Sequence, residues 1–354
     1  MSNYVIPKLP LDIDVETKRI LKKVSTARAA LAELNGTTKL IPNPTILINS
    51  LTLQEAKDSS AIENIITTHD ELYKADIKIG NITLQTKEVQ NYRQALLFGY
   101  ELVKKHDCIL INDIVKIQEK LEHNTVGIRK IEGTVLMNDK TNDIVYEPPQ
   151  NYNDIVNYLT NLENFINSDD DVDPLIKMAI IHHQFESIHP FHDGNGRTGR
   201  IINVLYLILK KLLDLPVLYL SGYIIANKSE YYHQIQEVRD SGNWEDRIYF
   251  ILDGVEETAL MTTNTIKNIW DIMGETKKLM KSQLSFYSKD FLELLFKHPY
   301  TKIDFVVKEL GVVRQTASKY LQELENLGIV EMVQIQKEKY YINVKLYDLL
   351  RKGF

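Results

Sequence analysis

The segment "IHPFHDGNGRTGR", residues 188–200, places two histidines, one acid, three glycines and two arginines directly before an apolar stretch, "RIINVLYLILKKLLDL". An apolar pattern on all sides predicts a helix buried at the centre of the core. Because glycine tolerates positive backbone angles, Gly194, Asn195 and Gly196 can direct successive N–H groups toward one point. The segment therefore predicts an anion-binding turn at the start of a buried helix.

The side chains around this turn form a set suited to a nucleotide polyphosphate. The N–H groups at a helix start favour phosphate oxygens. Arg197 and Arg200 are three residues apart, so both guanidinium groups can reach phosphate oxygens from one helix face. Asp193 is a hard carboxylate suited to Mg²⁺. His189 can take a proton near neutral pH, so the set predicts chemistry as well as binding.

The stretch "HPFHDGNGRTGR" resembles the Fic motif, His-x-Phe-x-Asp/Glu-Gly-Asn-Gly-Arg-x-x-Arg, at every specified position. The resemblance extends from about residue 50 to 255. It implies a mainly α protein with a Fic-type helical bundle core. It also implies transfer of AMP from ATP to a Ser, Thr or Tyr hydroxyl of a target protein or of the protein itself. The implied roles are base for His189, Mg²⁺ binding for Asp193, phosphate binding for Gly194, Asn195, Gly196, Arg197 and Arg200, and a core anchor for Phe191.

A second motif lies upstream, in "SSAIEN", residues 59–64. Ser59-x-x-x-Glu63-Asn64 is similar to the inhibitory motif Ser/Thr-x-x-x-Glu-Gly/Asn of Fic proteins, and on a helix Ser59 and Glu63 share a face. The resemblance implies an N-terminal inhibitory helix in which Glu63 pairs with Arg200 and withdraws it from the γ-phosphate. The same architecture leaves open removal of AMP by a deAMPylating phosphodiesterase, and the sequence does not separate the two directions.

The segment "GIRKIEGTVLMNDKTNDIVYEPP", residues 127–149, predicts a β-hairpin about a polar turn. In the Fic resemblance this hairpin is a flap that pairs with the backbone of the target protein. Adenine is expected near "SEYYHQ", where Tyr231 or Tyr232 could stack on the base. An aromatic pair on a helix suits the core equally well.

Local signals predict where further helices begin. Thr52 and Glu55 form the pattern of a capping box at the start of a helix. Asp173 and Pro174 suit the N-cap and first position of another. We expect an N-terminal helical region carrying the inhibitory helix over residues 1–110, a Fic catalytic core over 111–255, a helical connector over 256–284 and a further domain over 285–354.

The last domain has the pattern of a winged helix-turn-helix: three short helices, with Gly311 in a turn, then two strands. Eleven Lys and Arg against nine Asp and Glu give it a net charge of +2. Its recognition helix would start near Arg314, and the wing would carry Lys337 and Lys339. DNA binding, protein docking and homodimer formation all stay open. The recognition helix is expected to present Arg314, Gln315, Thr316, Ser318 and Lys319.

The whole chain of 354 residues has a formal charge of −6, which argues against a general nucleic-acid coat. No apolar run is long enough and free enough of charge to span a bilayer. The start lacks a basic segment followed by an apolar core, and Cys108 is the single cysteine. We expect a cytoplasmic protein without membrane association.

Two rival functions remain open. A transcription regulator could sense a nucleotide at the same turn without chemistry, and it would not need a base at His189. A metal-dependent phosphohydrolase using His182, His183 and His192 is the poorer alternative, because adjacent His182 and His183 do not share a helix face. P-loop chemistry is excluded because the chain has no Gly-x-x-x-x-Gly-Lys-Ser/Thr segment.

Overall fold

The buried helix expected after the glycine-rich turn is α8 (Asn195–Leu209), and nearly all of its residues are inaccessible to solvent. The computed structural model describes residues 4–77, 82–138, 141–335 and 338–352. Four helices pack directly on α8: α2 (Pro44–Ile62), α4 (Leu84–His106), α5 (Ile111–Glu122) and α7 (Pro174–Ile188). The predictions of a mainly α fold and of a central buried helix are confirmed.

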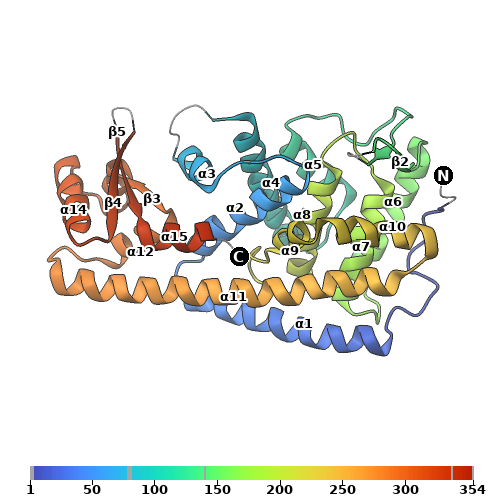
Figure 1. The fold of residues 1–354 in the computed structure, drawn as a ribbon, viewed down its shortest axis with the longest axis horizontal. Coiled ribbons are helices and arrows are strands. Elements are labelled where there is room, and N and C mark those ends of the chain that lie inside the picture. Colours follow the sequence, from blue (N-terminus) through green and yellow to red (C-terminus); the bar gives the residue numbers. More distant parts are fainter. Residues whose placement is uncertain (1–3, 78–81, 139–140, 336–337, 353–354) are drawn as a thin grey trace.

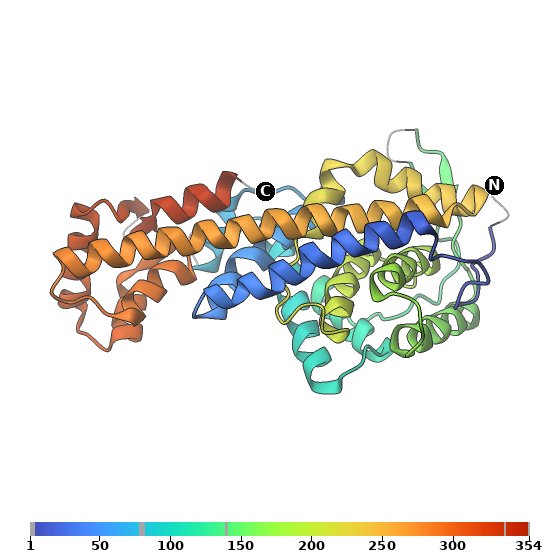
Figure 2. The same ribbon diagram turned by 90° about the horizontal axis from the view of Figure 1, so that it is seen from below.

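A long helix, α11 (Trp244–Gln283), runs along most of the molecule and joins the core to the C-terminal unit (Figure 1). Helix α1 (Lys18–Thr37) lies beside it, as Figures 1 and 2 both show. The pair brings the first and last parts of the core together. The other elements of the N-terminal part and the core are η1 (Thr38–Leu40), α3 (His69–Asp76), α6 (Tyr152–Asn167), α9 (Leu220–Ala226) and α10 (Lys228–Ser241).

The start of α2 differs from the prediction. Asn43 is the N-cap, its side chain accepts from Thr45 N, and Pro44 occupies the first turn, so Thr52 and Glu55 lie inside the helix. The capping-box prediction is wrong because an Asn-Pro start signal precedes it and because the Glu55 carboxylate is buried, accepting from Ser221 N at 3.0 Å. The start predicted for α7 is confirmed, with Asp173 as N-cap and Pro174 following.

The predicted hairpin is present as a short ladder. Strand β1 (Leu136–Met137) pairs antiparallel with β2 (Ile144–Tyr146), with an irregular register. Residues 139–140 of its turn lie outside the described residues. The ladder is tied to the core through Tyr146, whose hydroxyl donates to Ser187 O at 2.9 Å and whose ring lies 3.7 Å from the Arg239 guanidinium.

The C-terminal unit contains the three expected helices and the expected hairpin. Two further elements were not predicted: strand β3 (Tyr300–Lys302) and helix α15 (Val344–Lys352). Because β3 is three residues long and pairs with β5 some forty positions later, no local pattern marks it. The three-stranded antiparallel sheet has the order β3-β5-β4. The other elements are α12 (Lys289–Lys297), α13 (Ile303–Leu310), α14 (Arg314–Asn326), β4 (Val330–Ile335) and β5 (Glu338–Asn343).

Among the helices of the described ranges, none combines the length and the apolar character that crossing a membrane requires. The long helix α11 is an example, because acidic and basic residues interrupt its apolar positions near both ends and polar threonines do so in the middle.

Gly99 lies at the closest approach of α4 to its neighbours. A Cβ atom there would meet Leu205 Cδ1 at 2.6 Å and Ile117 Cδ1 at 2.9 Å. We predict that Gly99→Ala lowers the free energy of unfolding by about 1–3 kcal/mol, because packed helices would have to separate. Gly36 in α1 is the control, since nothing lies within 4 Å of its Cβ position.

Gly36→Ala should leave the free energy of unfolding unchanged or raise it by up to about 1 kcal/mol. Urea unfolding followed by circular dichroism measures both variants. Coincident unfolding curves for Gly99→Ala and the parent would show that Leu205 and Ile117 make room for a methyl group without loss of stability.

Candidate active site

The loop between α7 and α8 is closed by one reciprocal side-chain contact. Asn195 Oδ1 accepts from Phe191 N at 2.9 Å, and Asn195 Nδ2 donates to Phe191 O at 2.8 Å. The Phe191 ring is buried against Phe185, which agrees with the predicted anchor. The Asn195 side chain therefore holds the loop in shape, and its backbone N–H remains at the start of α8.

The start of α8 leaves backbone donors without acceptors inside the helix. Gly194 is in the left-handed region, with φ 76°, and Thr198 N is the first donor to close a turn, onto Gly194 O at 2.9 Å. The N–H groups of Asn195, Gly196 and Arg197 precede that bond, so they have no acceptor inside the helix. Gly194 N–H donates to Asp193 Oδ1 at 2.7 Å. The donors expected to bind an anion are thus those of the first helical turn.

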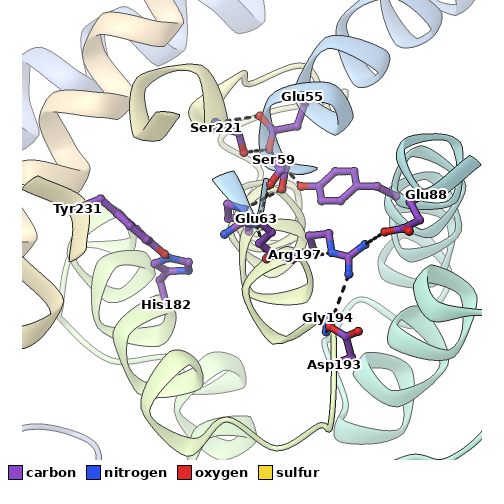
Figure 3. A network of polar contacts seen from close by, with 12 residues as sticks. Glu55, Ser59, Glu63, Glu88, His182, Asp193, Gly194, Arg197, Ser221 and Tyr231 are labelled. Carbon is purple, nitrogen blue, oxygen red and sulfur yellow. Dashed lines mark hydrogen bonds and ion pairs between the residues drawn. The ribbon is translucent and has the colours of Figure 1, made fainter. Parts of the chain in front are cut away.

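Arg197 is surrounded by three carboxylates from other parts of the core, of which Figure 3 shows those of Glu63 and Glu88. Its Nε donates to Glu63 Oε2 at 2.7 Å, and its remaining nitrogens lie 2.9 Å from Glu122 Oε1 and 3.4 Å from Glu88 Oε2. The Arg197 side chain is 3% exposed, so these contacts replace solvation. Asp193 is a weaker neighbour, at 3.7 Å.

Arg200 is held by the predicted inhibitory motif. Its Nε donates to Ser59 Oγ at 2.7 Å, and its Nη2 donates to Ser59 O at 2.9 Å and to Glu63 Oε1 at 2.7 Å. Burial, the largest single influence, lowers the pKa of Arg200, but Glu63 together with Tyr231, Tyr92 and Glu186 raises the pKa overall. The expected Glu63–Arg200 pair is present, and Glu63 also binds Arg197 through its second oxygen.

Two glycines of the motif make room for these carboxylates. A Cβ atom on Gly196 would lie 2.6 Å from Glu63 Oε1, and one on Gly194 would lie 2.3 Å from Glu122 Oε1. Real Cβ atoms do not approach oxygen so closely, so a side chain at either position would displace an acid. Glycine here serves the approach of the carboxylates as well as the turn.

Glu122 has no place in either motif. Burial raises the pKa of its carboxyl group to about 7, with Arg197 opposing and the acids Asp193, Glu63 and Glu88 adding to the rise. The positive charge of Arg197 is therefore shared among several acids, and not all of them need be ionised at neutral pH.

The direction of Glu63 follows from how α2 ends. Asn64 has φ 63°, in the left-handed region. Its N–H donates to Ala61 O at 3.0 Å, and Ile65 N–H donates to Ser60 O at 3.1 Å. This is a Schellman ending, and it requires glycine or asparagine at the left-handed position. The Gly/Asn of the inhibitory motif thus ends the helix just after the glutamate.

His189 lies at the C-cap of α7 with φ 47° and ψ 60°. Burial, together with the positive charge of Arg129, lowers the pKa of its imidazole to about 4. The ring is therefore neutral at physiological pH and can accept a proton. It lies at the end of α7, and its role as a base stays a prediction.

Asp193 is the predicted Mg²⁺ ligand, and its side chain is 75% exposed. Within the described ranges, no group of three or more His, Cys, Asp or Glu side chains is arranged to hold a metal ion. An exposed single carboxylate beside a phosphate-binding turn fits Mg²⁺, which takes one or two carboxylates and completes its shell with phosphate oxygens and water.

The adenine prediction is wrong for Tyr231. Its ring is 1% exposed, its hydroxyl pairs with His182 Nε2 at 2.7 Å, and the Arg247 guanidinium lies 4.9 Å from its centre (Figure 3). Packing on α11 has made this tyrosine part of the core. Tyr232 is 48% exposed and stays a prediction for adenine stacking.

The histidines of the phosphohydrolase alternative do not converge. His182 and His183 are fully buried, and His183 packs edge-on against Trp244 with ring centres 4.7 Å apart. Burial lowers the pKa of each well below its ordinary value. His192 is exposed on the loop. The two adjacent histidines are thus neutral core residues.

Sequence reasoning missed several residues of the site. Glu88, Gln118, Glu122 and Arg129 all contact the catalytic loop or Arg197, and Gln118 Nε2 donates to Asp193 O at 3.2 Å. Gln118 and Glu122 are four residues apart on α5, so their side chains share one helix face. This spacing is the one local signal in the sequence that could have marked them as neighbours.

Three family models match this chain: "Fic/DOC family N-terminal" over residues 21–101, "Fic/DOC family" over residues 108–207, and "Protein adenylyltransferase SoFic-like, C-terminal domain" over residues 272–346. The helical core, the motif loop and these matches define a Fic-fold protein. The chain belongs to the Fic/DOC family.

Curated relatives carry the name protein adenylyltransferase. A probable protein adenylyltransferase of Aquifex aeolicus is 26% identical over 203 residues, covering 51% of this chain and 59% of its own length. Protein adenylyltransferase fic-1 of Caenorhabditis elegans is 31% identical over 134 residues, covering 37% of this chain and 24% of its own length. The match spans less than two thirds of either relative.

Solved structures support the fold. A Fic family protein from Desulfovibrio desulfuricans superposes with a TM-score of 0.62 at 18% identity, covering 94% of this chain and 97% of its own. A Fic-1 fragment from Caenorhabditis elegans superposes with a TM-score of 0.54 at 19% identity, covering 70% and 73%. At this identity the likeness concerns the arrangement of helices.

The Schellman ending of α2 can be tested at Asn64. We predict that Asn64→Val destabilises the protein by about 1–2 kcal/mol, because a β-branched residue is strained at positive φ. Asn64→Gly is the matched control and should be neutral or slightly stabilising. Thermal unfolding measures both. If valine and glycine unfold at the same temperature, the left-handed position does not constrain the helix end.

Proposed function

We propose that the protein transfers AMP from ATP to a hydroxyl group of a protein and that Glu63 restrains this reaction. The observation that carries the proposal is the double ion pair of Glu63 with Arg197 and Arg200 at the start of α8. Both arginines are buried cations that a phosphate group would satisfy as well as a carboxylate does. The names of the relatives agree with this reaction class.

In the proposed reaction the neutral imidazole of His189 takes the proton of a target hydroxyl. The hydroxyl oxygen forms a bond to the α-phosphorus of ATP, and the bond from that phosphorus to the bridging oxygen breaks. The electron pair leaves with pyrophosphate, and the imidazolium later loses its proton to solvent. The N–H groups of Asn195, Gly196 and Arg197 stabilise the phosphate charge during the transfer.

Asp193 would hold Mg²⁺ at this site. The ion would supply positive charge to the phosphate oxygens. The chain's own part is to keep the Asp193 carboxylate in place, through the 2.7 Å bond from Gly194 N–H and the contact of its carbonyl with Gln118. Arg197 and Arg200 would then bind the oxygens that Mg²⁺ does not reach.

Glu63 would act as the restraint by competition. Its two carboxylate oxygens occupy the two guanidinium groups that a γ-phosphate needs, so ATP would bind in a pose unsuited to attack. When the Glu63 carboxylate withdraws, it no longer neutralises the positive charges of Arg197 and Arg200. A bound polyphosphate would then supply the negative charge that Glu63 had provided. Inhibition and phosphate binding thus use the same arginines.

The expected partner is a protein with a Ser, Thr or Tyr hydroxyl, or this protein itself, presented along the β1–β2 flap. DNA binding has less support, because Arg314 is paired with Asp304 at 2.5 Å and Lys319 lies 3.8 Å from Glu323. Lys339 belongs to the proposed wing, while Lys337 lies outside the described residues. We retain a cytoplasmic setting and homodimer formation as proposals.

The decisive experiment compares the parent with Glu63→Gly in intact-mass analysis after incubation with ATP and Mg²⁺. We predict a gain of one or more AMP groups in the variant and at least a tenfold lower labelled fraction in the parent, because Arg197 and Arg200 become available to phosphate. The variant Glu63→Gly/His189→Ala should bind ATP and show no labelling.

Three results would revise the proposal. Equal labelling by the parent and Glu63→Gly would remove the restraint. ATP binding without any labelling, in all variants, would favour nucleotide sensing without catalysis. If an AMP-labelled protein loses its AMP faster with the parent than with Glu63→Gly, the direction is removal of AMP, with Glu63 taking part.

A further inference from the structure

Arg129 lies in the loop between α5 and β1 and is fully buried. Its Nε donates to His189 O at 2.8 Å, its backbone N–H donates to Pro190 O at 2.9 Å, and its Nη2 donates to Pro149 O. One residue therefore joins the turn that carries the catalytic histidine to the end of the flap hairpin.

The turn at His189 requires such a partner. The residue adopts left-handed backbone angles, which cost about 1–2 kcal/mol for an L-residue unless the surroundings fix them. Its carbonyl accepts the bond from Arg129 Nε at 2.8 Å. Because the Arg129 side chain is fully buried, its guanidinium cannot exchange this bond for one with solvent.

We propose that Arg129 is a positioning residue for the transfer reaction: it fixes the turn that presents His189 and ties that turn to the flap. This inference rests on the proposed function. Arg129 is not proposed to touch ATP or the target hydroxyl. It acts through its hydrogen bonds to the backbone carbonyls of His189, Pro190 and Pro149.

The same residue acts on His189 through its charge. Four groups influence the imidazole: Arg129 and Arg239 lower its pKa, while the Glu186 carbonyl and Asp193 raise it. Burial contributes the largest part of the lowering. Removing the charge of Arg129 should therefore raise the pKa of His189. Since a base must be neutral to act, the acid limb of the rate profile should then move to higher pH.

The test uses Arg129→Gln and Arg129→Lys in the Glu63→Gly background, with AMP transfer measured across pH. We expect Arg129→Gln to lower kcat by about 10–100-fold with little change in KM for ATP, and to move the acid limb upward. Arg129→Lys keeps the charge, so its acid limb should stay in place while part of the rate returns. Arg314→Gln, at an exposed arginine of the C-terminal unit, is the control.

If kcat falls in both variants while the acid limb of the pH profile stays in place, Arg129 contributes only to packing. If kcat is unchanged in both variants, Arg129 has no role in the reaction. If Arg129→Gln does not fold, Arg129→Lys decides alone: a kcat equal to the Glu63→Gly parent overturns the proposal, and a reduced kcat with an unshifted limb supports it. No labelling by Glu63→Gly itself would refute the proposed function instead.

A second inference comes from contacts at the other end of α2, the helix that carries Glu63. Asn43 Nδ2 donates to Glu293 Oε2 and Asn49 Nδ2 donates to Lys297 O, each at 3.0 Å. Glu293 and Lys297 belong to α12 of the C-terminal unit. The inhibitory helix therefore begins against the C-terminal unit and ends in the active site (Figure 1).

The chain just after Glu63 contacts the same unit. In α3, Asp70 Oδ1 accepts from the Tyr300 hydroxyl at 2.5 Å, and the Tyr73 ring stacks on Tyr300 with centres 6.1 Å apart. Tyr347 of α15 completes a group of three rings. His69 of α3 in turn contacts Gln54 of α2.

We infer that the C-terminal unit holds the chain both before and after Glu63, through α2 and α3, and so sets the strength of the restraint; this pair of contacts is called the clamp. A partner that shifts this unit would change the position of α2 and thereby the hold of Glu63 on Arg197 and Arg200. This inference also rests on the proposed function, but it depends on contacts distant from the catalytic loop.

The clamp is tested with the double variant Glu293→Ala/Tyr300→Phe, which removes the hydrogen bond from Asn43 before Glu63 and the hydrogen bond to Asp70 after it. We expect AMP labelling to rise about threefold to tenfold in the otherwise unchanged protein. In the Glu63→Gly background the same pair should have no effect, because no restraint remains. Hydrogen exchange of α2 should increase.

Lys345→Met is the matched control, since it removes an exposed ion pair with Glu275 of α11 and leaves α2 untouched. Unchanged labelling together with faster exchange of α2 would overturn the clamp, and so would an equal rise in the Glu63→Gly background. If Glu63→Gly shows no labelling, the proposed function fails, while the exchange of α2 still reports on the clamp.

Discussion

The arrangement depends on two buried guanidinium groups that share one carboxylate. Arg197 and Arg200 project from the first turns of α8, each 3% exposed, and Glu63 reaches both with its two oxygens at 2.7 Å. Cations so far from water require an anion, because the solvation they lose must be replaced. The site is therefore built for negative charge, and the protein supplies that charge itself.

This requirement explains the neighbouring structure. Gly194 and Gly196 leave space in which the oxygens of Glu122 and Glu63 lie against the helix. The ending of α2 at Asn64 points Glu63 inward, and α5 brings Glu122 to the other side of Arg197. Each acid comes from a different helix. The packing of α2 and α5 on α8 therefore determines which negative charges lie around Arg197 and Arg200.

The position of α2 has consequences beyond the site. One helix contacts the C-terminal unit at Asn43 and Asn49 and the arginines at Ser59 and Glu63. In the clamp proposed above, this helix is the element through which the C-terminal unit would act on Arg197 and Arg200.

The sequence alone determined the motif loop, the buried helix, the hairpin, the Glu63–Arg200 pair and the outline of the C-terminal unit, because each follows from residues close together in the chain or from a motif. Only the tertiary structure decided the second contact of Glu63 with Arg197, the contacts of Glu122 and Arg129, and the burial of Tyr231. Those depend on helices that meet from distant parts of the chain, and packing between them leaves no local pattern to read.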